Sequence, residues 1–435
     1  MLTMVYGFNF VDRQIVGILG PFIQNDLNIS DTQFGLLVGF AFAALYTIMG
    51  IPIAIIADKV NRVSLISISL AVWSGFTALT GTAQNFVQIL LARVGVGIGE
   101  AGGSPPSHSI ISDVYPKEER AGALGVYSLG IPLGIMSAYF VTAALLGLGK
   151  GETVPWRRIF IILGLIGVGF ALILKLLIKE PPRGAAELQK GKQAVKIPLK
   201  EAVPLLLKIP SWWWMALGIA SGSFAAYAFS GFQTKFLIAL DPSYDFQKLV
   251  MWLGVINGIA YTSGTFYGAR LVDKLGKKDV RAYGWAPFAA MMLAFPFAAG
   301  SFWVGSVNAH LLMTVGTLFC LGIYLGPSFA IAQTLAPTHI RATSTALFFF
   351  VLNMIAMGGG PFTAGLLMDM FAVNADNLPK EEFVITREYY EAVRLAMTLI
   401  CLAFIAAMVC FFMVTRYLPK DWAEAEKRNE ADAQA

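Results

Sequence analysis

Four ionisable residues lie in the middle of long apolar stretches of the sequence. Asp12 and Arg13 occur in FNFVDRQIV, and Arg93 and Glu100 occur in LLARVGVGIGEAGG. A charge at the centre of a bilayer is costly, so such residues usually face a water-filled cavity or one another. With two acids and two bases, the net charge of the group is zero when all four are ionised, as burial demands. The four residues are therefore predicted to form acid–base pairs.

The spacing of the second pair predicts which way its helix faces. Arg93 and Glu100 are seven residues apart, about 10.5 Å along a helix, and lie on nearly the same face. Gly95, Gly99 and Gly103 recur every four residues on a different face, which predicts close packing against a neighbouring helix. The charged face is then free to line a cavity.

The same four residues predict two different chemical roles. Counting from the outer ends of two antiparallel helices places Asp12 and Arg13 at depths between Arg93 and Glu100, so that two pairs can form. We expect Asp12 and Glu100 to bind a coupling proton, which would release Arg13 and Arg93 for an anionic substrate. The alternative is a static salt-bridge network that only fixes helix packing.

The composition requires a membrane as solvent for these helices. The 435 residues are 57% hydrophobic and 14% charged, and the mean hydropathy is +0.66, which excludes a soluble fold. Apolar stretches of about 20 residues recur along the chain, and none resembles a cleavable signal peptide. About twelve transmembrane helices are predicted, and they begin near residues 1, 33, 64, 86, 119, 156, 211, 247, 281, 307, 341 and 389.

One long polar stretch divides the chain. The predicted parts are a first six-helix half (1–179), a cytoplasmic linker (180–210), a second six-helix half (211–417) and a cytoplasmic tail (418–435). Lys and Arg concentrate in the loops on the linker's side and in the tail, which places both termini in the cytoplasm. Short loops favour a bacterial inner membrane, and we expect a monomer.

Short charged turns repeat at matched positions of the two halves, Asp58–Arg62 after the second predicted helix and Asp273–Lys278 after the eighth. They resemble the loop motif G-x-x-x-D-R/K-x-G-R/K-R/K of the major facilitator superfamily, although alanine replaces the leading glycine in both copies and Asn61 replaces the second glycine in the first copy. A carboxylate here can meet a helix N-terminus and a nearby Arg, and so latch one face of a transporter. Ordinary positive-inside loop charges are the alternative. The predicted latch residues are Asp58, Arg62, Arg120, Asp273, Lys274 and Arg341.

Three further motifs occur: N-x-x-D-R at Asn9–Arg13, R-x-G-x-G-I-G-E-A at Arg93–Ala101 and the S-P-P that follows at Ser104–Pro106. Together they resemble one branch of that superfamily, the Spinster lipid transporters. The resemblance covers mainly the first half. It implies an all-α integral membrane fold with two pseudo-symmetric six-helix halves. It also implies a lysophospholipid or sphingosine-1-phosphate type of substrate, and places Asn9 beside the arginines in head-group binding.

The second half offers aromatic side chains and no charge at mid-membrane depth. One charged half and one aromatic half suit a molecule with an ionic head and an acyl tail, although any single ring could instead face lipid or a neighbouring helix. The candidate tail-binding residues are Phe224, Tyr227, Phe232, Tyr261, Phe319, Tyr324 and Phe349. Lys235, near the outer end of its helix, is predicted to snorkel to the interface, with contact to a substrate head group at the outer mouth as the alternative.

These patterns predict a secondary active transporter that works by alternating access, is coupled to protons and carries an anionic amphiphilic lipid. The main alternative is a carrier of small water-soluble organic anions or drugs. A lipid-modifying enzyme that uses Glu100 and His108 is remote, because those residues are about 12 Å apart along a helix. The G-x-G-x-x-G at Gly97–Gly102 follows no strand, and no H-E-x-x-H, G-x-S-x-G or Walker A motif occurs. We expect no cofactor, metal or nucleic-acid partner.

Overall fold

The computed structural model describes residues 1–57, 59–115, 117–146, 154–182, 199–337, 340–372 and 387–434, and in these residues it is built from helices joined by short turns. Apolar stretches form helices in a membrane because only then are all backbone N–H and C=O groups satisfied within the segment. Eleven helical segments of the described residues are long and apolar enough to cross a membrane. They begin within about three residues of the predicted positions.

The first predicted segment is not among those eleven. Helix α1 (Leu2–Leu27) has 26 residues, enough to span about 39 Å, but Asn9, Asp12, Arg13 and Gln14 make its middle polar. Its length and its place at the start of the chain match the first of the twelve predicted spans.

The N-terminal part of the chain contains ten helices in the described residues. They are α1, α2 (Asp31–Gly35), the π-helical turn η1 (Leu36–Phe40), α3 (Ala41–Ala57), α4 (Arg62–Thr80), α5 (Phe86–Glu100), α6 (Ser104–Val114), α7 (Lys117–Ser128), α8 (Gly130–Leu146) and α9 (Trp156–Leu177).

The remaining helices follow the stretch predicted as a linker. They include α10 (Leu199–Leu207), α11 (Pro210–Leu240), α12 (Phe246–Ile256), η2 (Asn257–Tyr261), α13 (Thr262–Gly276), α14 (Ala282–Ser301), α15 (Val307–Ile323), α16 (Leu325–Thr334), α17 (Arg341–Leu352), η4 (Asn353–Gly359), α18 (Gly360–Phe371), α19 (Arg387–Ile400) and α20 (Leu402–Gln434). The predicted tail is thus a continuation of the last helix.

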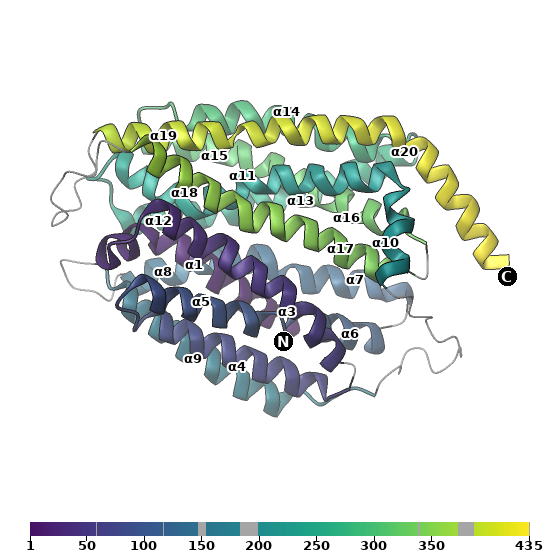
Figure 1. The fold of residues 1–435 in the computed structure, drawn as a ribbon, viewed down its shortest axis with the longest axis horizontal. Coiled ribbons are helices and arrows are strands. Elements are labelled where there is room, and N and C mark those ends of the chain that lie inside the picture. Colours follow the sequence, from purple (N-terminus) through teal and green to yellow (C-terminus); the bar gives the residue numbers. More distant parts are fainter. Residues whose placement is uncertain are drawn as a thin grey trace. The chain divides into compact units, whose positions relative to one another are not determined.

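The chain folds into two compact units that do not follow the order of the sequence. Unit 1 contains 1–192, 230–258 and 361–392, and unit 2 contains 193–229, 259–360 and 393–435. Within unit 1, α4 packs along α9 and α5, and α8 packs along α1 and α12 (Figure 1). Within unit 2, α14 packs against α15 and α20.

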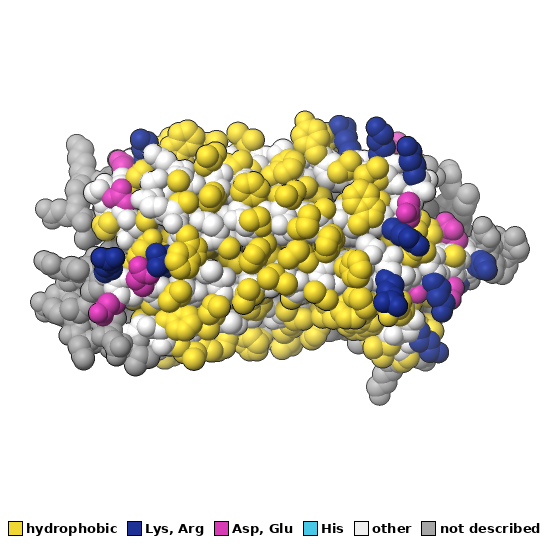
Figure 2. All heavy atoms as spheres, turned by 90° about the horizontal axis from the view of Figure 1, so that it is seen from above, with side chains coloured by type: hydrophobic (Ala, Val, Ile, Leu, Met, Phe, Trp, Pro, Cys, Tyr) yellow, Lys and Arg dark blue, Asp and Glu magenta, His cyan; other side chains and the backbone are white. Residues whose placement is uncertain are grey.

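Glycine allows the closest of these approaches in unit 1. A Cβ on Gly95 would lie 2.4 Å from the Phe76 ring, and one on Gly99 would lie 2.8 Å from Trp73, both on α4. The predicted packing role of the α5 glycine face is confirmed. On the face drawn in Figure 2, hydrophobic side chains cover the middle and charged side chains gather toward the two ends.

Candidate functional site

The charged residues of α1 and α5 meet inside unit 1. Arg13 Nε donates a hydrogen bond of 2.8 Å to Glu100 Oε2, and the Glu100 side chain is fully buried while that of Arg13 is 15% exposed. The Asn9 amide also contacts Glu100. The predicted pairing of a helix-one arginine with a helix-four carboxylate is therefore present, and the role of each residue in coupling or binding remains a prediction.

The helix that carries Glu100 ends at that residue. Helix α5 begins at an Asn85 cap, whose side chain accepts from the backbone N–H of Gln88, and it stops where Gly102 and Gly103 precede the prolines of α6. The C-terminal end of a helix carries partial negative charge and disfavours a carboxylate. The Arg13 guanidinium that pairs with Glu100 compensates the negative charge that meets at this helix end.

The second pair is more deeply enclosed. Asp12 and Arg93 are each 2% exposed and close enough to attract one another, and Asp12 also lies beside Trp73 and Thr77 of α4. Within the described residues, Nε and Nη1 of Arg93, Oδ2 of Asp12 and Oε1 of Glu100 have no hydrogen-bond partner in the protein. A buried charged donor without a partner is costly. The cluster thus keeps capacity to bind an anion and to accept a proton.

Aromatic rings of α1 and α3 surround the arginines. The Arg13 guanidinium lies 5.3 Å from the Phe10 ring centre, 4.9 Å from that of Phe42 and 4.6 Å from that of Tyr46. Arg93 lies 5.3 Å from the same Phe42 ring. Phe10, Phe42 and Tyr46 were not among the predicted site residues. The only available signal was the spacing of Phe42 and Tyr46, which places both rings on one helix face.

The predicted tail-binding aromatics divide between the two units. Phe232 belongs to unit 1, where it is fully buried and packs on Phe34 at 5.5 Å. In unit 2, Tyr324 is 2% exposed and shares a hydrogen bond of 2.8 Å with Ser223, whereas Phe349 is 41% exposed. The other candidates, all partly exposed and in unit 2, are Phe224, Tyr227, Tyr261 and Phe319. Their role in tail binding stays a prediction.

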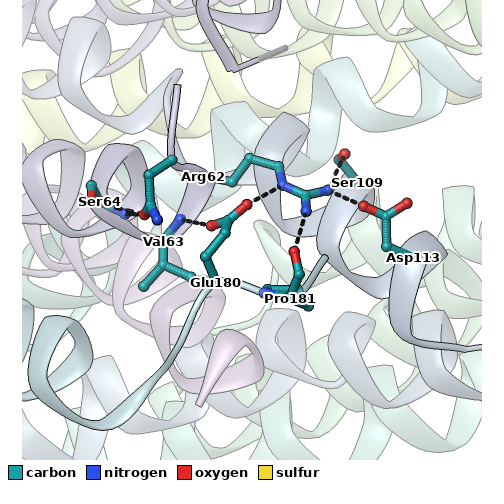
Figure 3. Close-up of polar contacts among 8 residues, drawn as sticks. Arg62, Val63, Ser64, Ser109, Asp113, Glu180 and Pro181 are labelled. Atoms are coloured by element: carbon teal, nitrogen blue, oxygen red, sulfur yellow. Dashed lines mark hydrogen bonds and ion pairs between the residues drawn. The ribbon is translucent and has the colours of Figure 1, made fainter. Parts of the chain in front are cut away.

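The first copy of the loop motif forms a buried polar network around Arg62 (Figure 3). The Arg62 side chain is 1% exposed. Its Nε donates to Glu180 Oε1 at 2.7 Å, its Nη1 to Ser109 Oγ at 2.9 Å and to Asp113, and its Nη2 to the Pro181 carbonyl at 3.1 Å. One guanidinium thereby joins α4, α6 and the chain that leaves α9.

The start of α4 explains how the first copy tolerates Asn61 in place of glycine. The Asn61 side chain accepts from the Ser64 backbone N–H at 2.7 Å and caps the helix. The second carboxylate oxygen of Glu180 accepts from the Val63 N–H at 2.9 Å. A side-chain cap and a carboxylate both stabilise the positive end of a helix, so this N-terminus is satisfied without the usual glycine.

The second copy of the motif is built differently. Asp273 and Lys274 are exposed at the end of α13, and the Tyr283 hydroxyl donates to Asp273 at 3.4 Å. Three predicted latch side chains lie outside the described residues: Asp58, Arg120 and Arg341. Lys277, which occupies the position of Arg62 in this copy, is exposed, so sequence repetition does not imply equal burial at matched positions.

A further buried cluster in unit 1 was not predicted. The Lys235 ammonium forms an ion pair with Asp31 Oδ1, and the two side chains are 12% and 3% exposed. Gln24 Nε2 donates to the same oxygen at 2.8 Å, and the Tyr389 hydroxyl donates to the other. The prediction that Lys235 snorkels to the interface is wrong, because a carboxylate 204 residues away in sequence offers it a closer partner.

Backbone contacts tighten this Asp31 cluster. The Asp369 carboxylate accepts from the backbone N–H groups of Asp31 and Thr32, at 3.1 and 2.8 Å, and so stabilises the N-terminus of α2. A Cβ on Gly365 would lie 2.0 Å from the Asp31 carbonyl oxygen, and one on Gly35 would lie 2.3 Å from that of Pro361. Helix α18 approaches α2 this closely only because glycine lacks a side chain.

Replacement of Lys235 by Met is expected to lower the thermal stability of the purified protein. The substitution leaves the buried Asp31 charge with only neutral side-chain donors, and a lost hydrogen bond to a charged group costs about 1.5–3 kcal/mol. Thermal unfolding in detergent would measure the loss. Lys248→Met, at an exposed lysine of α12, is the matched control and should change little. Equal midpoints for the two variants would show that the ion pair contributes nothing net.

Metal binding has no visible basis here, since the described residues include no group of three or more His, Cys, Asp or Glu side chains that could hold a metal ion.

Known proteins resemble this chain over most of its length. The profile of the Major Facilitator Superfamily matches residues 2–361. An MFS-type efflux pump of Mycolicibacterium smegmatis is 30% identical over 85% of this chain and 83% of its own length. A sphingosine-1-phosphate transporter of Danio rerio is 23% identical over 94% and 81%.

A solved structure extends the likeness to the fold. A bacterial homologue of the human lysosomal transporter Spinster, in an inward-facing and unoccupied conformation, is 30% identical and superposes with a TM-score of 0.85 over 97% of this chain and 96% of that one. The predicted major facilitator fold of the Spinster type is confirmed.

Proposed function

Because the chain belongs to the major facilitator superfamily and to its Spinster branch, we propose that it is a proton-coupled secondary transporter of an anionic amphiphilic lipid, of the lysophospholipid or sphingosine-1-phosphate type. Family and fold are those of membrane transporters rather than of enzymes. The proton, the lipid and the alternating-access cycle are the proposed part.

The observation that carries this proposal is the buried cluster of Asp12, Arg13, Arg93 and Glu100. It contains a guanidinium with two nitrogen positions that no protein group satisfies, beside two carboxylates that each have an unpaired oxygen. An anionic head group would satisfy Arg93 with charge-assisted hydrogen bonds. A proton on Glu100 would neutralise the partner of Arg13 and free that guanidinium as well. Proton binding and substrate binding would thus act on the same charges.

The amphiphilic part of the proposal rests on what surrounds the charges. Phe10, Phe42 and Tyr46 place apolar ring surface next to the arginines, and unit 2 supplies the partly exposed rings of Phe224, Tyr227, Tyr261 and Phe319. The relative in Danio rerio is named for sphingosine-1-phosphate. The rings beside the arginines suit the apolar part of a molecule with an anionic head and an acyl chain.

A carrier of small organic anions or drugs is the second candidate. It is favoured by the relative in Mycolicibacterium smegmatis, an efflux pump that is 30% identical to this chain. Arg93, whose Nε and Nη1 have no hydrogen-bond partner in the protein, would bind a soluble anion by the same contacts. Only the acyl chain distinguishes the two candidates.

For the topology, we propose an inner-membrane monomer with six-helix halves 1–179 and 211–417 that works by alternating access, with the linker 180–210, the tail 418–435 and both termini in the cytoplasm. In this arrangement the Arg62 network lies on the cytoplasmic side and the Asp31 cluster on the opposite side.

Competition binding separates the two candidate substrates. We expect a lysophospholipid or sphingosine-1-phosphate to displace a labelled lysolipid from the purified protein at concentrations at least tenfold below those needed for a short-chain analogue with the same head group. The acyl chain would supply that difference, since each buried methylene contributes about 0.8 kcal/mol. Equal potency of the short-chain analogue would favour the small-anion carrier. An Arg93→Ala variant controls for adsorption of lipid to the detergent micelle.

A further inference from the structure

One aromatic ring contacts both arginines of the charged cluster. Phe42 lies on α3, two residues after the π-helical turn η1, in which the Ala41 N–H bonds back to the Leu36 carbonyl. Its ring centre is 4.9 Å from the guanidinium of Arg13 and 5.3 Å from that of Arg93. The extra residue of a π-turn rotates the following side chains around the helix, and such turns often occur at functional sites.

The Phe42 ring has little room to move. The side chain is 1% exposed, and it stacks on Tyr46 at 5.8 Å with an angle of 12° between the rings. On the other side, a Cβ on Gly97 would lie 3.1 Å from the Phe42 carbonyl oxygen and 3.4 Å from Cδ2. Helix α5 therefore holds the ring in place through a residue that has no side chain.

The charges next to the Phe42 ring interact with one another. Arg93 is attracted by both Glu100 and Asp12 and repelled by Arg13, while Arg13 is hydrogen-bonded to Glu100. Two cations could thus compete for one carboxylate. The face of an aromatic ring is electronegative and attracts a cation by about 0.5–2 kcal/mol. A single ring that contacts both guanidiniums stabilises each one without neutralising it.

We propose that Phe42 is a positioning residue that keeps Arg13 on Glu100 and Arg93 beside Asp12, and so sets which arginine is released when a carboxylate is neutralised. This inference deepens the proposed function and rests on it, since the arginines are taken to bind substrate. An apolar side chain of similar size would fill the same space but would attract neither guanidinium. The aromatic character of residue 42, rather than its volume, is what the cluster requires.

The first test does not depend on any substrate. Dicyclohexylcarbodiimide reacts with protonated carboxyl groups in apolar surroundings, and mass spectrometry measures its addition to Glu100. Phe42→Leu is expected to raise the labelling rate severalfold, because Arg13 is held less firmly on the carboxylate. Phe42→Tyr, which restores the ring, should return the rate to that of the unmodified protein. Equal labelling of the Leu variant and the unmodified protein would overturn the proposal.

The second test displaces the ring without removing it. Gly97→Ala places a methyl group against Phe42 and is expected to raise Glu100 labelling by a smaller factor than Phe42→Leu. Gly75→Ala on α4 is the matched control, because a Cβ there meets nothing within 4 Å. Thermal unfolding and gel filtration of each variant verify folding. If both alanine variants label at the same rate, the contact with Phe42 does not position the arginines.

Binding of a labelled lysolipid then connects the ring to transport. Phe42→Leu should weaken binding about 2- to 30-fold, the range that a cation–π contact of this strength allows, and Phe42→Tyr should restore it. If the unmodified protein binds no lipid, the proposed function fails, whereas the carbodiimide result still decides the role of Phe42.

Discussion

Glu100→Gln and Asp12→Asn are each expected to abolish lysolipid accumulation driven by a pH gradient while binding and exchange persist. Each variant mimics the protonated carboxyl permanently, so no proton can be carried. Exchange needs no net proton movement, and the arginines remain available to an anionic head group. Uptake into vesicles with and without an imposed pH gradient, beside binding to the same purified variants, measures both quantities.

Arginine variants of the same cluster should fail differently. Arg93→Ala or Arg13→Ala removes a charge-assisted donor worth about 1.5–3 kcal/mol, which corresponds to a loss of binding of about 10- to 150-fold. Removal of Arg13 also leaves Glu100, which is fully buried, without the guanidinium that pairs with it. Normal gradient-driven uptake by both carboxylate variants would identify the cluster as a static salt-bridge network, and the proposed coupling would be wrong.

Arg62→Met is expected to lower the free energy of unfolding by about 3 kcal/mol, at the low end of the range for breaking a buried ion pair. Arg62 is 1% exposed, and Asp113 and Glu180 are 18% and 22% exposed, so water compensates part of the loss on the carboxylates. The substitution also removes the hydrogen bond that the Pro181 carbonyl accepts from Arg62. Thermal or denaturant unfolding in detergent gives the size of the effect.

Two comparisons make the Arg62 result specific. Lys274→Met removes an exposed basic residue of the second motif copy and should change stability by less than about 0.5 kcal/mol. Arg62→Lys keeps the charge but not the planar guanidinium, so its free energy of unfolding should lie between those of Arg62→Met and Lys274→Met. If Arg62→Met and Lys274→Met are equally stable, the buried network does not stabilise the N-terminus of α4.

The parts of the fold that the sequence predicted are those that follow from local physics. A helix in a membrane must be apolar over about 20 residues, so helix positions could be read directly. The pairing of Arg13 with Glu100 was also predictable, because two charges at similar depth in neighbouring helices have few other partners. Breaks within the predicted helices, such as the one after Glu100, were not foreseen.

The missed features depend on residues that are distant in the chain. Lys235 appeared to be an isolated interfacial lysine because its partner Asp31 is 204 residues away, and Asp369 reaches the backbone of α2 over 338 residues. Phe42 was one aromatic among many, and its place beside both arginines depends on the turn η1 and on the approach of Gly97. Burial could not be predicted from the motif either, since Arg62 is buried and Lys277, at the matched position of the second copy, is exposed.

If proton movement and lipid movement occur together, protons can be followed directly during transport. Vesicles that contain the purified protein and a trapped pH-sensitive dye would receive a lysophospholipid or sphingosine-1-phosphate without any imposed gradient. We expect a pH change that requires the lipid, occurs with the unmodified protein and disappears in Glu100→Gln. Lipid transport by the unmodified protein without any accompanying pH change would contradict it.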